Sequence, residues 1–241
     1  MTQIQRSWVD HSLAHLSVGE MEITGRLVDA SNATLFGVMR HEGVDIEVIY
    51  KPVAGERPLW DFPDGTLADR EYAAFLLSDQ MGLDLVPPTI LREGPAGFGM
   101  VQRWIDVDES IDLSSYFAQD KSELRLLALF DAIINNTDRK IGHLLPDQNG
   151  HLFACDHGVT FHCEDKLRTV LWQWAGDALN EDECEILDKC SLFIEEKKSL
   201  LSKHLTENEI AATKARIRRL RVDGIMPLPS EDWPAIPWPA Y

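Results

Sequence analysis

The sequence predicts an α+β protein in which a β-rich N-terminal part precedes a helical C-terminal part. Two runs rich in β-formers, residues 21–29 and 45–50, flank a stretch with turn and hairpin signals. Later, apolar residues recur at helical spacing over residues 123–136, which indicates a long buried helix. The change in composition falls near Ile105, so we expect two parts, residues 1–105 and 106–241.

The composition is that of an ordinary globular protein with an acidic surface. With 241 residues, 44% of them hydrophobic, the chain can bury a sizeable core. The formal net charge of −17 disfavours binding to nucleic acid or to anionic membranes. Every apolar run is shorter than about 18 residues, which predicts no transmembrane segment. The four cysteines lack paired spacing, and the N-terminus lacks a targeting pattern. We therefore expect a cytoplasmic protein with free thiols.

One basic segment runs against this acidic balance. Residues 214–221 carry five basic side chains, and Ile217 and Leu220 are spaced to face inward from a helix. Such a segment is more often a solvated helix face than a docking site. The less common alternative is a contact with phosphate or with an acidic partner.

In the N-terminal part we expect a small antiparallel sheet, a structured loop and one helix. The loop at residues 52–65 is rich in Pro and Gly, and Leu59, Trp60 and Phe62 are its expected anchors. The helix should run from Leu67 to Met81 and stop at Gly82. A strand is expected over residues 97–106.

In the C-terminal part we expect helices and one small hairpin. The helix over residues 123–136 ends in an Asn-rich turn, and β-like runs at 143–145 and 151–156 flank another turn. Further helices are expected at residues 169–179, 183–205 and 207–221. The Pro- and Trp-rich residues 227–241 should be extended and packed through their aromatic side chains.

Four residues have types and positions that suit phosphoryl transfer. This chemistry requires a cation on the nucleotide phosphates, ligands for a divalent metal and a carboxylate near the attacking hydroxyl. Lys51 ends a strand, Glu71 lies on the following helix, and Asp138 lies in a turn after the long helix. Asp156 ends a β-like run, two residues before Gly158. Each alone is more often an exposed lysine or a turn aspartate, but the ordered set favours a site.

Four segments resemble, in order, motifs of the phosphatidylinositol 3-/4-kinase-like superfamily. They are IYKPVAGERP, REYAAFLLSDQMGLDLVPPT, LFDAIINNTDR and CDHGVTFHCEDKLRTVLWQWA, within residues 20–175. The chain looks most similar to type II phosphatidylinositol 4-kinases and more distantly to HipA-like toxin kinases. The resemblance implies a two-lobed protein-kinase-like fold, with a β-rich N-lobe, a helical C-lobe and the nucleotide in the cleft between them.

The resemblance also implies a role for each site residue in an ATP-dependent kinase that uses Mg²⁺ or Mn²⁺. Lys51 would bind phosphate, Glu71 would orient Lys51, Asp138 would be the catalytic-loop aspartate, and Asp156 would bind the metal. Two further groups are implied. A phosphate-covering turn would contain Ser31, Asn32 and Thr34, and an adenine-binding hinge would contain Met100, Gln102 and Trp104.

Two departures from the family pattern leave the activity and the acceptor open. His143 stands where the family has Asn as a second metal ligand, which favours manganese over magnesium. The Cys-rich palmitoylation insert of the eukaryotic lipid kinases is absent. The acceptor is therefore an inositol lipid, a protein side chain or a small alcohol. The alternatives to a kinase are a pseudokinase that senses nucleotide with little turnover, and a fold that binds no nucleotide.

Overall fold

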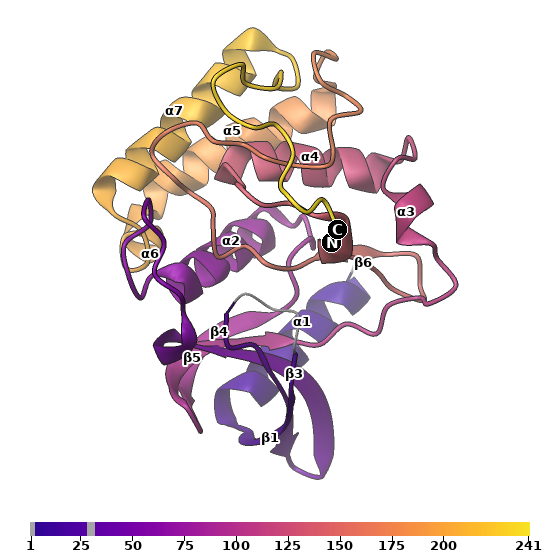
Figure 1. Cartoon of the computed structure of the whole chain (residues 1–241), viewed down its shortest axis with the longest axis vertical. Helices are drawn as coiled ribbons and strands as arrows, with labels where there is room; N and C mark the ends of the chain where they lie inside the picture. The colour runs from indigo at the N-terminus through magenta and orange to yellow at the C-terminus, as the bar shows by residue number, and fades with distance from the viewer. Residues whose placement is uncertain (1–2, 28–31) are drawn as a thin grey trace. The chain divides into compact units, whose positions relative to one another are not determined.

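The computed structural model describes residues 3–27 and 32–241, and the chain divides into two compact units, Met1–Ile105 and Asp106–Tyr241. Figure 1 traces both along the chain. The first unit contains an antiparallel sheet and two long helices, and the second is mainly helical. The expected α+β fold class is therefore confirmed, and each unit is described by itself below.

The first unit is built on a five-stranded sheet in the order β1-β2-β3-β5-β4, in which all neighbours are antiparallel. The strands are β1 (Glu20–Arg26), β2 (Leu35–His41), β3 (Val44–Pro52), β4 (Thr89–Gly94) and β5 (Gly97–Arg103). The expected β-rich runs therefore form β1 and β3. A turn at Glu42 and Gly43, both with positive φ, joins β2 to β3 as a hairpin.

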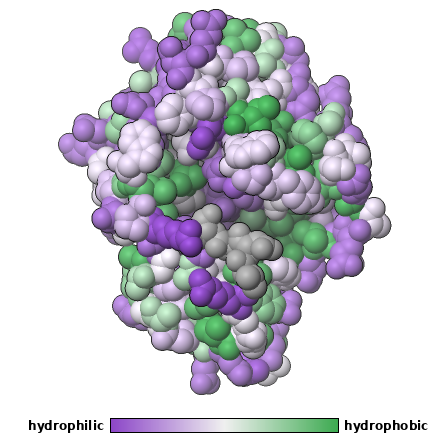
Figure 2. Space-filling view, in the orientation of Figure 1, coloured by the Kyte–Doolittle hydropathy of each residue, from purple (hydrophilic) through white to green (hydrophobic). Residues whose placement is uncertain are grey.

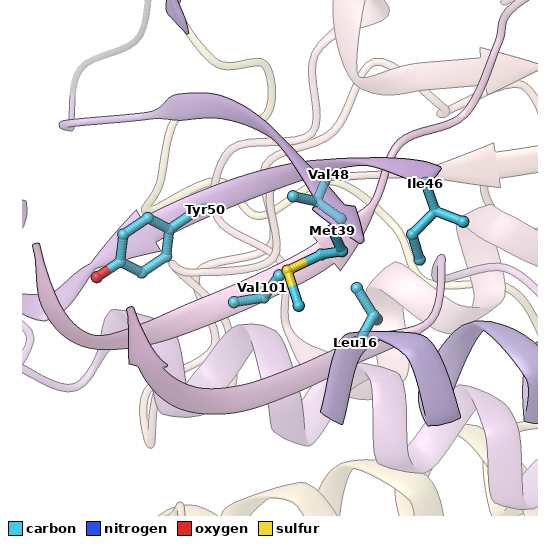
Figure 3. Packing of buried hydrophobic residues seen from close by; sticks show 6 residues of the cluster. All are labelled: Leu16, Met39, Ile46, Val48, Tyr50 and Val101. Atoms are coloured by element: carbon cyan, nitrogen blue, oxygen red, sulfur yellow. The ribbon is translucent and has the colours of Figure 1, made fainter. Parts of the chain in front are cut away.

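Helix α1 (Gln3–Val18) covers one face of this sheet through a small apolar core. Ile46, Val48 and Tyr50 alternate along β3 and are buried, as expected for side chains that share one face of a strand. Figure 3 shows Leu16 of α1 pointing into the cluster that these residues form with Met39 and Val101. Neither α1 nor β4 was expected from the sequence.

Helix α2 (Leu67–Met81) has the predicted bounds and packs on β4 and β5. Gly82 ends it with φ of 67°, the left-handed conformation that glycine adopts readily. In the loop before α2, Phe62 is buried beneath the Arg70 guanidinium. The expectation that Trp60 anchors this loop is wrong, because 84% of its side chain is exposed.

The second unit packs α4 (Ser122–Ile134), α5 (Glu181–Glu196) and α7 (Glu207–Asp223) against one another. Leu127, Phe130, Ile133 and Ile134 form the buried side of α4, as the periodicity predicts. The expected hairpin is present as β6 (Leu144–Pro146) and β7 (Leu152–Ala154). The remaining short elements are α3 (Leu113–Tyr116), α6 (Lys198–Leu201) and two 3₁₀ turns, η1 (Val53–Gly55) in the first unit and η2 (Ile141–His143) in the second.

Two helix predictions for the second unit are wrong. Residues 169–179 form bends and turns, because the indole N–H groups of Trp172 and Trp174 donate to Ala235 and Asp120, and Gly176 has φ of 81°. The helix expected over residues 183–205 is split into α5 and α6. The backbone leaves helical geometry at Lys197, where φ is −115° and ψ is 22°.

The basic segment on α7 is largely neutralised by acidic neighbours. Lys214, Arg219 and Arg221 pair with Glu195, Asp165 and Asp188 respectively. Arg216 is buried, and Ile217 and Leu220 face inward as expected. The segment is thus a helix face held by ion pairs rather than a broad cationic surface.

On the face shown in Figure 2, hydrophilic and hydrophobic residues are interspersed. Across the described ranges, no helix has the length and apolar character to cross a membrane.

Replacing Leu16 by Ala should destabilise the first unit by about 2–5 kcal/mol, because it leaves a cavity where α1 meets the sheet. Val18→Ala is the matched control on the same helix, since 62% of Val18 is exposed. Urea unfolding of both variants measures the difference. Equal stability losses in the two would show that Leu16 does not fasten α1.

Candidate functional site

The first unit contains the predicted ion pair between Lys51 and Glu71. The Lys51 ammonium lies 2.6 Å from a Glu71 carboxylate oxygen, and the two side chains are 18% and 2% exposed. Strand alternation directs Lys51 away from the core face that holds Tyr50 and Val48. A buried carboxylate strongly needs a cation, so this pair fixes the direction of the lysine stem.

Two local features position the pair. Glu56, in the loop after β3, accepts hydrogen bonds from the backbone N–H groups of Leu67 and Ala68 at 3.1 and 2.8 Å. It thereby caps the N-terminus of α2, one turn before Glu71. Beside Lys51, a Cβ atom at Gly99 would lie 2.4 Å from the Lys51 carbonyl oxygen. Glycine is therefore required there for β5 to pair with β3.

The proposed phosphate-covering turn is only partly described, because Ser31 lies outside the described residues. The Asn32 side chain accepts a hydrogen bond from the backbone N–H of Arg57 at 2.8 Å. Thr34 is 4% exposed, and its carbonyl accepts from Leu27. Asn32 and Thr34 thus stabilise the turn, and the buried Thr34 offers little surface to a ligand, whereas Asn32 is partly exposed.

The proposed hinge residues are likewise engaged inside the first unit. Met100 has no exposed surface, and the Gln102 side chain donates to Thr89 at 2.9 Å. The backbone N–H of Trp104 donates to the Glu47 carbonyl. Contact between these groups and an adenine ring therefore stays a prediction that requires the backbone of Trp104 to exchange its partner.

In the second unit, two asparagines shape the turn that presents Asp138. Asn135 ends α4 with φ of 53°, and its side chain bonds to the backbone of residues 162, 164 and 166. The Asn136 side chain donates to Asp131 and accepts from the Asp138 N–H at 3.0 Å. The Asn-rich sequence therefore supplies the left-handed conformation and also the amides that hold the turn.

Asp138 lies in an environment that suits a proton acceptor. Its carboxylate lies 3.3 Å from the Lys140 ammonium, and its side chain is 29% exposed. Burial raises the pKa of Asp138 above its ordinary value, and the charge of Asp156 raises it further, while Lys140 and Arg168 lower it. The net upward shift makes Asp138 a stronger base than an exposed aspartate.

Arg139 links the parts of this site from a fully buried position. Its guanidinium makes two charged hydrogen bonds to Asp131 at 2.9 and 3.0 Å, and neither side chain has exposed surface. It also donates to the Cys155 carbonyl and to Nε2 of His157, each at 2.7 Å. Because arginine has no acceptor, His157 Nε2 must accept. The residues on either side of Asp156 are thus tied to the helix end before Asp138.

Asp156 adopts an unusual backbone conformation for a residue other than glycine. Its φ is 63°, which costs roughly 1–3 kcal/mol unless the surroundings impose it. The bonds from Arg139 to Cys155 and His157 impose it here. The carboxylate is 47% exposed and lies 3.4 Å from Nε2 of His143. Strain of this kind is concentrated at functional sites.

The donor atoms at Asp156 fit a divalent cation, with one condition on His143. Two ligands at bond lengths of about 2.1 Å lie roughly 3 Å apart in an octahedral site, close to the observed separation. However, His143 Nδ1 accepts a long hydrogen bond of 3.4 Å from the Lys140 N–H, which places the ring proton on Nε2. Binding a metal through Nε2 therefore requires the other tautomer and the loss of that bond.

A complete protein cage for a metal is absent from the described part of the chain, where no three His, Cys, Asp or Glu side chains converge.

Several residues that build the site were not identified from the sequence, namely Glu56, Asp131, Arg139, Lys140, His157 and Arg168. A signal existed for Asp131, because a charged residue within an otherwise apolar helical run needs a buried partner. Its partner is eight residues away. Helical periodicity does not predict that pairing, since Arg139 lies beyond the helix end.

Replacing Arg139 by Met should destabilise the protein by about 3–5 kcal/mol, because it leaves the Asp131 carboxylate buried without a cation. The double variant Arg139→Met with Asp131→Leu should recover most of that loss. As a control, Arg221→Met breaks an exposed pair and should cost no more than about 1 kcal/mol. Denaturant unfolding gives all three values, and an Arg139→Met loss as small as the control would contradict this role.

Comparison with known proteins finds a curated relative and a similar solved structure. No family model matches the sequence. Among solved structures, the Helicobacter pylori proinflammatory kinase CtkA superposes with a TM-score of 0.48 and 13% identity, over 86% of this chain and 93% of that one. Protein Rv2133c of Mycobacterium tuberculosis is 39% identical over 271 aligned positions, which cover 96% of each chain. This chain therefore belongs to the same protein family as Rv2133c.

Proposed function

We propose that this protein is an ATP-dependent phosphotransferase of the phosphatidylinositol-kinase-like superfamily. The observation that carries the proposal is the buried pair of Lys51 and Glu71. A sheet can end in a lysine without any such partner, because an exposed ammonium is fully solvated. Holding the ammonium against a carboxylate that is 2% exposed instead suits a group that must be aimed at phosphate oxygens.

The second unit supports the proposal with two aspartates in different environments. Asp138 has a raised pKa and lies beside Lys140, which suits a residue that orients an acceptor hydroxyl and takes its proton. Asp156 is half exposed and held in a strained conformation, which suits a metal ligand. Separate roles for two carboxylates commonly follow from such differences in environment.

The cofactors that we propose are ATP and Mg²⁺ or Mn²⁺. Asp156 would hold the metal, with His143 as a second ligand in its other tautomer. When bound, the ion would neutralise charge on the phosphate oxygens. In the tautomer described above, His143 instead presents its Nε2–H to the Asp156 carboxylate, 3.4 Å away.

The acceptor that we propose is an alcohol, on an inositol lipid or on a protein. The motif resemblance favours the lipid, whereas the net charge of −17 opposes an anionic membrane. The ion pairs along α7 add to that opposition, since Lys214, Arg219 and Arg221 are already matched by acids. A protein hydroxyl is therefore the acceptor that the surface favours.

A pseudokinase is the second candidate, and the tautomer of His143 favours it. If His143 keeps its proton on Nε2, it does not bind the metal beside Asp156, and the metal is held more weakly. The chain would then bind nucleotide with little turnover.

ATP consumption in the presence of Mg²⁺ or Mn²⁺ separates these candidates. A kinase should hydrolyse or transfer phosphate measurably, and Asp156→Asn should abolish this while the melting temperature is retained. His143→Asn, which restores the family residue, should raise turnover with Mg²⁺, and His143→Ala should not. Nucleotide binding without turnover in the wild type and in His143→Asn would establish the pseudokinase, and absence of binding would overturn both.

The pH dependence of turnover should report on Asp138. Because the base must be ionised, activity should fall as the pH drops through its raised pKa. Lys140 lowers that pKa, so Lys140→Met should move the acidic limb of the kcat profile to higher pH, and Lys140→Arg should leave it in place. An acidic limb that is unchanged in Lys140→Met would assign the limb to another group.

A further inference from the structure

We propose that residues 232–241, here named the C-terminal strap, position the candidate catalytic loop, residues 137–143. This inference rests on the proposed function for the meaning of that loop. In Figure 1 the strap is the yellow segment that follows α7 and runs to the chain end beside β6. It has no helix or strand of its own, so its backbone groups must find partners elsewhere.

The strap first contacts the segment that follows Asp156. The Ala235 carbonyl accepts hydrogen bonds from the Thr169 N–H at 3.0 Å and from the Trp172 indole at 2.9 Å. The centroid of the Trp233 ring lies 4.9 Å from the Lys166 ammonium nitrogen and 5.5 Å from the central carbon of the Arg168 guanidinium. Both distances are within the range of cation–π attraction.

That segment in turn holds the catalytic loop. Arg168 donates through Nε to the Thr137 carbonyl at 2.7 Å and through its backbone N–H to Asn136 at 2.9 Å. The Arg139 N–H donates to the Arg168 carbonyl, and the Val170 N–H donates to the Arg139 carbonyl. The Arg168 side chain thus lies between the Trp233 ring and the residue that precedes Asp138.

The strap then contacts the catalytic loop directly. The Ala240 carbonyl accepts from the Ile141 N–H at 2.9 Å. A Cβ atom at Gly142 would lie 4.0 Å from the Tyr241 ring. Both residues belong to η2, which ends at His143. The strap therefore holds the loop on both sides of Asp138, through Arg168 before it and through η2 after it.

The strap contains two tryptophans with contrasting surroundings, which provide a matched pair of variants. Trp233 covers two cations, whereas Trp238 is 93% exposed. Trp233→Ala should release Arg168 and loosen the loop, Trp233→Phe should restore the contact with an aromatic face, and Trp238→Ala should have no effect. A fourth variant that lacks residues 232–241 removes both contacts.

The experiment measures hydrogen exchange and ATP turnover on the full-length protein. In Trp233→Ala we expect the Arg139 and Thr169 amides to exchange faster, with an unchanged melting temperature. In the truncated variant the Ile141 amide should also exchange faster. We expect kcat to fall by roughly 10- to 100-fold in Trp233→Ala, the range that small misplacement of reacting groups produces, while KM for ATP is kept. Lys51 and Glu71 belong to the other unit, so the strap variants should not change the affinity for ATP.

The outcomes distinguish failure of this inference from failure of the proposed function. Unchanged hydrogen exchange in Trp233→Ala, or an equal rise in Trp238→Ala, would contradict the proposed role of the strap even in an active kinase. Faster exchange with unaltered kcat would show a contact without a positioning role and would overturn it too. A wild type without ATP turnover would remove the proposed function, and with it the positioning of a catalytic loop, whatever the exchange data show.

Discussion

A guanidinium without exposed surface must find every hydrogen-bond acceptor inside the protein, and the way Arg139 does so organises the second unit. Its partners come from the end of α4 and from both neighbours of Asp156. A buried ion pair gains little stability over apolar packing. The main effect of this pair is instead to restrict the backbone, because few backbone arrangements satisfy all of these hydrogen bonds together. These bonds tie the end of α4, just before the turn at Asp138, to the strained backbone at Asp156. The asparagines at the end of α4 add the remaining constraints.

The first unit positions its candidate site residues differently, through regular elements rather than buried turns. Strand alternation sets the direction of Lys51, and the cap from Glu56 fixes where α2 begins and so where Glu71 lies. Burial raises the pKa of Glu56, while the two backbone N–H groups lower it. A rigid strand and a capped helix can hold a charged pair precisely without many buried polar contacts. Turns need such contacts, which explains why the second unit devotes more buried charge to its site.

This difference also explains which features the sequence predicts. The bounds of α2 follow from apolar spacing and Gly82, and the pair of Lys51 with Glu71 follows from the order of motifs. The residues at 169–179 mislead, because the indole N–H groups of Trp172 and Trp174 bond to the strap and to Asp120 instead of lying on a regular helix. The prediction for Trp60 fails because its aromatic side chain, which was expected to anchor the loop, is exposed. Arg139 was unpredictable because its partners are joined by the tertiary fold, not by sequence spacing.

The acidic composition makes the positions of the cations informative about how a nucleotide would be attracted. At a net charge of −17 the overall field repels a polyphosphate, so attraction must come from local groups. Many cations are already matched, among them Arg216 with Asp165 and Arg125 with Glu183. Lys140, which pairs with Asp138, and Arg168 both lower the pKa of this candidate base against the effect of burial. Lys140 and Arg168 thus supply positive charge beside the candidate base. The Trp233 ring holds one of these cations in place, so the strap contributes to the electrostatics of the loop as well as to its geometry.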